Sequence, residues 1–199
     1  MDFDDIRISE INIGMDNVGV LHDSVCGIIR HLSLKEKCGF VIDSFSARTV
    51  VSKKNIVVNN LKVRTPESDL DLDLAFIYDD FKCFNDFINE VAIRSEVRPT
   101  TLNFLDIAYF VKQMYGMNDL IHFSSDVKGK VSNLKVKRFM MTYSRDTYFD
   151  ADIAMNGLPR IEDTYINLKI RNLTTTVGDI NSVVIPAPGM AVTQLKLPQ

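Results

Sequence analysis

The chain has 199 residues, 46% of them hydrophobic, and its 23 basic and 26 acidic residues leave a net charge of −3. This near balance does not favour nucleic acid or an anionic membrane surface as a partner, and no apolar run approaches the roughly 20 residues that span a bilayer. The three cysteines lack C-x-x-C spacing and form neither a disulfide framework nor a zinc signature. The acidic start MDFDDIRIS is unlike a signal peptide, so either the protein is cytosolic or the start of a longer protein is missing.

The first quarter of the chain is predicted to form short strands joined by turns. Residues 5–13 alternate with a one-residue slip, which predicts two short strands separated by a bulge or a break, and residues 14–23 carry turn residues. The further elements expected before residue 56 are a strand through His31–Lys35, a turn over 36–39, strands over 40–47 and 48–52, and a polar turn over 53–55.

The clearest pattern lies between residues 56 and 76. A side-chain period of two over 68–76 predicts a strand with apolar side chains on one face and carboxylates on the other. The apolar set is Leu70, Leu72, Leu74 and Phe76, and the acidic set is Asp69, Asp71 and Asp73. Upstream, the β-branched runs 56–58 and 61–63 flank two asparagines. The stretch 65–68 predicts a turn, because Pro66 fixes its own φ and cannot donate to a ladder.

Two later stretches have helical spacing instead. Aromatic and aliphatic residues recur in this way over 81–91, which predicts a short helix or a compact loop, with Asn85 as a candidate cap. Residues 92–98 return to alternation before Pro99. Residues 104–115 are the best helix candidate, and Gly116 is a natural stop.

From residue 120 the chain alternates again. The expected strands cover 121–127, 134–143 with a slip at Arg138, 149–155 and 166–170, and the expected turns lie at 132–133, 144–147 and 156–159. Strands that follow each other through short turns favour a meandering antiparallel sheet, and no βαβ alternation supports a doubly wound fold. We expect residues 1–185 to form one elongated, mainly β unit with one or two short helices, followed by an irregular tail over 186–199.

Two long phrases resemble a known family. LSLKEKCGFVIDSFSARTVVSKKNIVVNNLKVRTPESDLDLDLAFIYDDF, followed by FINEVAIRSEVRPTTLNFLDIAYFV, resembles the TamB-like branch of the AsmA-like proteins, especially forms from the Bacteroidetes. The later phrase VKGKVSNLKVKRFMMTYSRDTYFDADIAMNGLPRIEDTYINLKI is similar to the recurring unit of the same family. The resemblance covers roughly residues 32–170 and lies in the order of turns and alternating strands.

The resemblance implies a fold and a role. Members of this family are anchored in the inner membrane by an N-terminal helix and cross the periplasm as a long, curled β-sheet with an apolar concave face. They are similar to bridge-like lipid transport proteins that carry phospholipids to the outer membrane, and a role in outer-membrane protein assembly with a barrel-assembly partner is also attributed to them. The present chain lacks the anchor and the C-terminal region that would meet this partner, which indicates a fragment.

An apolar sheet face suits such a role physically. Each CH₂ moved out of water contributes about 0.8 kcal/mol, so acyl chains strongly prefer an apolar trough to solvent. The residues predicted to line this groove are Leu70, Leu72, Leu74, Phe76, Phe149, Ile153 and Met155. The alternation alone also fits a structural or adhesion β-domain with a closed core, and the resemblance is what favours the open groove. An enzyme on a β-scaffold would need two carboxylates facing one cleft.

Other reactive residue types have ordinary explanations. The three aspartates lack the glycine-containing loop of a calcium site and are expected on a solvated outer face. His22, His31 and His122 are too scattered to predict a metal site. Cys83 lies among aromatic residues and is expected to be a small buried apolar group. We therefore assign no catalytic residue, metal or cofactor from the sequence.

Overall fold

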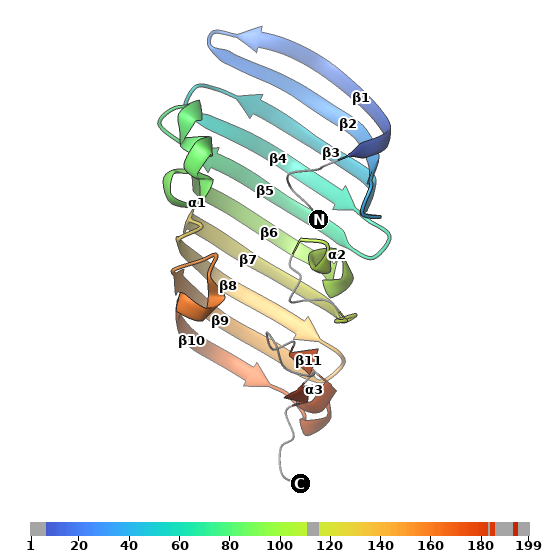
Figure 1. Cartoon of the computed structure of the whole chain (residues 1–199), viewed down its shortest axis with the longest axis vertical. Coiled ribbons are helices and arrows are strands. Elements are labelled where there is room, and N and C mark those ends of the chain that lie inside the picture. Colours follow the sequence, from blue (N-terminus) through green and yellow to red (C-terminus); the bar gives the residue numbers. More distant parts are fainter. Residues whose placement is uncertain (1–6, 111–115, 183, 186–192, 195–199) are drawn as a thin grey trace.

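A single ten-stranded antiparallel sheet organises the chain, with strands β1 to β10 side by side in chain order (Figure 1). The computed structural model describes residues 7–110, 116–182, 184–185 and 193–194. The strands are β1 (Ile8–Leu21), β2 (Ser24–Glu36), β3 (Val41–Val51), β4 (Asn55–Arg64), β5 (Asp69–Ile77), β6 (Ala92–Asn103), β7 (Leu120–Lys130), β8 (Asn133–Tyr143), β9 (Thr147–Asn156) and β10 (Tyr165–Thr174). The prediction of a mainly β, open meander is confirmed, because β1 and β10 form the two edges and do not pair with each other.

Several strands are longer than the sequence predicted. The turn expected over 14–23 is wrong, because β1 continues to Leu21, and the two strands expected over 40–52 are one strand, β3. The interruptions in alternation are bulges: Asn17 in β1 and Asn60 in β4 have φ angles of 50° and 51°, and both lie at shifts in strand register. A bulge inserts one residue without ending a strand. Sequence alternation therefore breaks at places where the sheet does not.

Short helices connect some strands. The connection from β5 to β6 contains η1 (Phe81–Asp86) and α1 (Phe87–Glu90). At the opposite ends of the strands, α2 (Phe104–Ala108) follows β6 and α3 (Val177–Ser182) follows β10 (Figure 1). The remaining elements are η3 (Ile161–Asp163) and the small strands β11 (Val184–Ile185) and β12 (Thr193–Gln194).

The helix predictions are corrected in detail. Asn85 is not a cap; the Asp80 and Asp86 side chains accept the capping hydrogen bonds instead. β6 does not end before Pro99 but continues through it, where its pairing with β7 shifts register. The α2 helix begins at residue 104 as expected and ends at Ala108, while residues 111–115 of the expected helix and most of the tail over 186–199 lie outside the described residues.

A bulge, two aspartates and an arginine link strands β4, β5 and β6 through hydrogen bonds and ion pairs. The backbone amide of the bulge residue Asn60 donates to Asp73 Oδ1 at 2.6 Å. On the next strand, Arg98 Nη1 lies 3.0 Å from Asp73 Oδ2, and Arg98 Nε donates to Asp71 Oδ1 at 2.7 Å. One arginine thus bridges two aspartates that flank a leucine on β5.

The same arrangement of a bulge, two aspartates and an arginine recurs in β8, β9 and β10. Arg138 has a φ of 50°, and its amide donates to Asp152 Oδ1 at 2.9 Å. Arg171 on β10 bridges Asp152, at 2.8 Å, and Asp150, at 2.5 Å. Both units also place a connecting 3-10 helix after their middle strand. The sheet therefore contains an internal structural repeat, with four strands from one copy to the next.

Candidate functional site

One face of the sheet carries mainly apolar side chains. Residues directly opposite in an antiparallel pair share a face, so the register traces a row from one strand to the next. Starting from Leu74 on β5, the row runs through Val58 of β4 and Thr49 of β3 in one direction, and through Ser95, Val127, Val136, Ile153 and Leu168 in the other. The groove residues predicted on β5 and on β9 therefore lie on the same face, which we call the apolar face.

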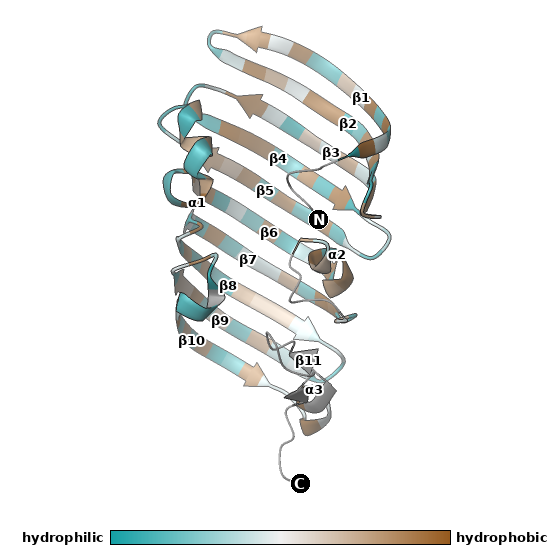
Figure 2. Cartoon of the chain, in the orientation of Figure 1, coloured by the Kyte–Doolittle hydropathy of each residue, from teal (hydrophilic) through white to brown (hydrophobic). Residues whose placement is uncertain are grey.

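Neighbouring rows extend this surface. Phe76 lies between Ile56 and Ile93, and Leu72 between Leu61 and Val97. On β9, Phe149 opposes Met141 and Leu173, and Met155 opposes Leu134 and Ile166. Figure 2 displays the resulting alternation of apolar and polar residues along the strands.

The apolar face keeps contact with solvent. All seven predicted groove residues are only partly buried, including those of β5 in the middle of the sheet. Towards the β10 edge, Leu168 and Ile170 are 51% and 48% exposed. In a sandwich, a facing sheet would remove such side chains from water. Among the described residues, the only other sheet is the short β11–β12 pair. The apolar face of the described sheet is therefore not the interior of a sandwich.

Aromatic side chains wall the apolar face at one end of the strands. Phe84 and Phe87 from the β5–β6 connection pack edge-on against Phe76, with ring centroids 6.4 and 5.5 Å apart. They surround a small core formed by Tyr78, Cys83 and Val91. Burial of Cys83 confirms the sequence prediction, and burial of Tyr78 raises the pKa of its phenol. This cluster fixes the connection on the sheet and limits the apolar face on that side.

A polar network holds α2 at the opposite end. Thr65 and Ser68, in the β4–β5 turn, donate hydrogen bonds to Asp106 Oδ2 at 2.6 and 2.5 Å. All three residues are buried. The Asn103 side chain caps α2 by accepting from the amide of Leu105 at 2.9 Å. The predicted turn over 65–68 is confirmed, but its link to Asp106 was missed, because 38 or more residues separate the partners.

A small apolar hollow lies near α2 and α3. It has a volume of about 200 Å³, and its lining includes Phe104, Met117, Ile121, Met141 and Ile180. Thr147 Oγ1 donates to Asp179 Oδ2 at 2.7 Å on its rim. Since Ile121 and Met141 belong to rows of the apolar face, this hollow extends that face towards the strand ends.

The opposite face, which we call the polar face, carries the predicted aspartates. Asp71 and Asp73 are paired with Arg98, and Asp69 lies 2.8 Å from Arg64. The hydrogen bond from Arg98 lowers the pKa of Asp73, and the one from Arg171 lowers that of Asp152. The outer-face prediction holds for these aspartates, which are engaged in ion pairs. Within the described ranges, no group of three His, Cys, Asp or Glu side chains is placed to hold a metal ion.

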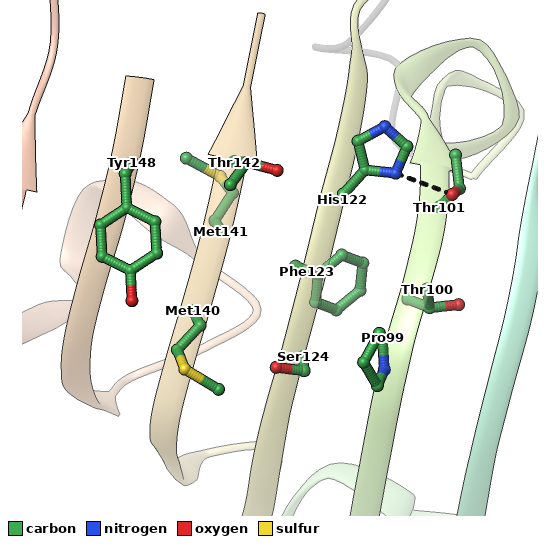
Figure 3. Close-up of a pocket in the computed structure, with 10 residues that line it drawn as sticks. All are labelled: Pro99, Thr100, Thr101, His122, Phe123, Ser124, Met140, Met141, Thr142 and Tyr148. Atoms are coloured by element: carbon green, nitrogen blue, oxygen red, sulfur yellow. Dashed lines mark hydrogen bonds between the residues drawn. The ribbon is translucent and has the colours of Figure 1, made fainter. Parts of the chain in front are cut away.

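A shallow hollow on the polar face contains His122 (Figure 3). Its volume is about 260 Å³, and strands β6 to β9 supply its lining. His122 Nδ1 lies 2.9 Å from Thr101 Oγ1, and Met140 and Tyr148 line the other side. The lining has no carboxylate, so this hollow offers no pair of acids for glycoside cleavage.

Comparisons of the chain with protein-family models, with curated proteins and with solved structures found no match. No helix in the described part of the chain is long and apolar enough to cross a membrane. The resemblance to the TamB-like family stays a prediction.

Proposed function

We propose that this chain is a non-enzymatic segment of a bridge-like protein that carries phospholipids along the apolar face of its sheet. One observation carries the proposal: a single-layer sheet of ten strands presents an apolar face that stays partly open to water along its whole length. Leaving so much apolar surface exposed is costly unless a ligand or partner covers it. An acyl chain is apolar along its whole length and would cover such a surface without leaving polar groups unpaired.

The dimensions agree with this role. Ten strands spaced by about 4.8 Å give a face about 43 Å long across the strands. Half of a bilayer hydrocarbon core is about 15 Å thick, so extended acyl chains fit along the face with room to move. The aromatic wall near α1 and the α2 end border the face at the two strand ends, which leaves the direction across the strands as its open axis.

The family resemblance supports the same role and adds a location. Under this proposal the full-length protein is periplasmic, is anchored in the inner membrane by a segment outside this chain, and carries phospholipid towards the outer membrane. Support for outer-membrane protein assembly, through a barrel-assembly partner bound elsewhere, belongs to the same proposal.

Lipid bound to the purified chain tests the proposal. We expect mass spectrometry of organic extracts to detect about one or more phospholipids per chain. The Leu72→Asp variant should lose most of this lipid, because it places a charge in the middle of the apolar face. Ala75→Asp is the matched control: it adds the same charge to the same strand on the polar face, opposite Arg94.

Circular dichroism must confirm that both variants keep the wild-type strand content. A lipid-free wild-type chain, or equal lipid loss in both variants, would contradict the proposal. The first result would favour a structural or adhesion domain without lipid cargo.

A further inference from the structure

A row of positive charges crosses three strands of the polar face. Arg94 on β6 lies directly opposite Lys128 on β7, and Lys128 lies directly opposite Lys135 on β8. All three side chains are exposed. Directly opposed side chains have Cβ atoms about 5 Å apart, and like charges in this position destabilise a sheet. Repulsion between these three positive charges is therefore expected to destabilise this part of the sheet.

Few negative charges offset this row. Arg94, Lys128 and Lys135 line a hollow, and its other charged lining residues are Lys130, Lys137, Glu96 and Asp126. Asp126 is already engaged by Arg138, whose Nε donates to Asp126 Oδ2 at 2.5 Å. The five cations and two carboxylates that line the hollow give it a local charge of about +3. This differs from the rest of the polar face, where Arg98 and Arg171 are each held between two aspartates.

The cations surround a hollow of ligand size. Its volume is about 750 Å³, within the range typical of small-molecule sites. The neighbouring row on the polar face carries Glu96, Asp126 and Lys137. An occupant is therefore favoured along the Arg94–Lys128–Lys135 row, on the side away from Glu96.

We propose that this hollow binds a small oligophosphate, a compact ligand with two or more linked phosphate groups. Arginine binds phosphate oxygens through two parallel N–H donors, and lysine binds them as a point charge. Two or three linked phosphates carry about as much negative charge as the hollow has in excess. This site lies on the face opposite the proposed lipid trough and is independent of it.

Titration with inorganic pyrophosphate tests the site. We expect pyrophosphate to shift the backbone amide resonances of β6, β7 and β8, and the Lys128→Gln/Lys135→Gln double variant to bind at least tenfold more weakly. Lys169→Gln is the control. Lys169, on β10, is exposed on the same face, but it lies directly opposite the acidic residue Asp152 of β9. It should bind like the wild type. The double variant relieves charge repulsion, so its unfolding midpoint should not fall, and this separates loss of binding from loss of fold.

Three results would overturn the proposal. Orthophosphate that binds as tightly as pyrophosphate would indicate an adventitious ion only. Equal weakening in Lys169→Gln would indicate general attraction to a charged surface. Binding to phosphatidic acid vesicles that depends on Lys128 and Lys135, without binding of pyrophosphate, would assign the cluster to a membrane surface instead.

Discussion

At the scale of single residues, Glu36 fixes the start of the sheet. Its side chain is buried, and its two oxygens accept the amide of Arg7 at 3.1 Å and the amide of Cys38 at 2.6 Å. The hydrogen bonds from Cys38, with a smaller contribution from Arg7, lower the pKa of Glu36 from 4.5 to about 2. The ionised carboxylate therefore joins Arg7, which precedes β1, to the β2–β3 turn.

This shift predicts an acid-sensitive contact. A lowered folded-state pKa stabilises the fold above the unfolded value, and that contribution is lost as the pH falls from about 4.5 to about 2. We expect the protection of the amides of Arg7 and Cys38, measured relative to the intrinsic exchange rate at each pH, to fall over this interval. Glu36→Gln should remove the pH dependence of the protection of both amides. Protection that stays constant down to pH 2 in the wild type would contradict this role.

At the scale of the strand, bulge residues decide where the pattern of alternation shifts. Asn60 has a left-handed backbone, and such a φ is unfavourable for β-branched residues by about 1–2 kcal/mol. We expect Asn60→Val to lower the free energy of unfolding by about this amount, and Asn60→Gly to change it little. Chemical denaturation followed by circular dichroism measures both.

Asn59→Val is the matched control, since residue 59 lies next to the bulge and is exposed without a positive φ. It should leave the unfolding midpoint nearly unchanged. Equal destabilisation by the two valine substitutions would mean that the left-handed conformation is not what selects asparagine at position 60.

The same bulges explain which elements could be predicted from sequence. The strand from Leu70 to Phe76 has no bulge, and its prediction was correct to within one residue at each end. Gly14, Asn17 and Gly19 looked like turn residues but lie inside β1. Asn17 has a positive φ at a bulge, and tolerance of this conformation favours asparagine in bulges and turns alike. Arg98 could not be assigned to Asp71 and Asp73, because strand register is a tertiary property.

At the scale of the whole molecule, alternation predicted a sheet with one apolar face but left open what covers it. The same period of two serves a sandwich and an open trough. The groove residues from Leu70 to Met155 were placed on one face by the register of five strands, β5 to β9, which no local pattern contains. The cationic row was missed for the same reason, since Arg94, Lys128 and Lys135 come together only through strand pairing.

The open sheet predicts a gradient of stability. Each strand pairs only with its neighbours in chain order, so inner strands have two partners and edge strands one. We expect amide hydrogen exchange to be fastest in β1 and β10 and slowest in β5 to β7, and mass spectrometry of peptic fragments can measure this. Protection that is uniform from β1 to β10 would indicate a single cooperative unit instead.

Chain-ordered pairing also sets how the molecule responds to force. Hydrogen bonds between antiparallel strands run perpendicular to the strands, which is along the long axis of this sheet. Tension applied from β1 to β10 therefore loads the hydrogen bonds of all nine strand pairs in series, and the weakest pair separates first. A protein stretched in this direction would lengthen by releasing strands one at a time, while a load parallel to the strands would have to shear several hydrogen bonds of a ladder at once.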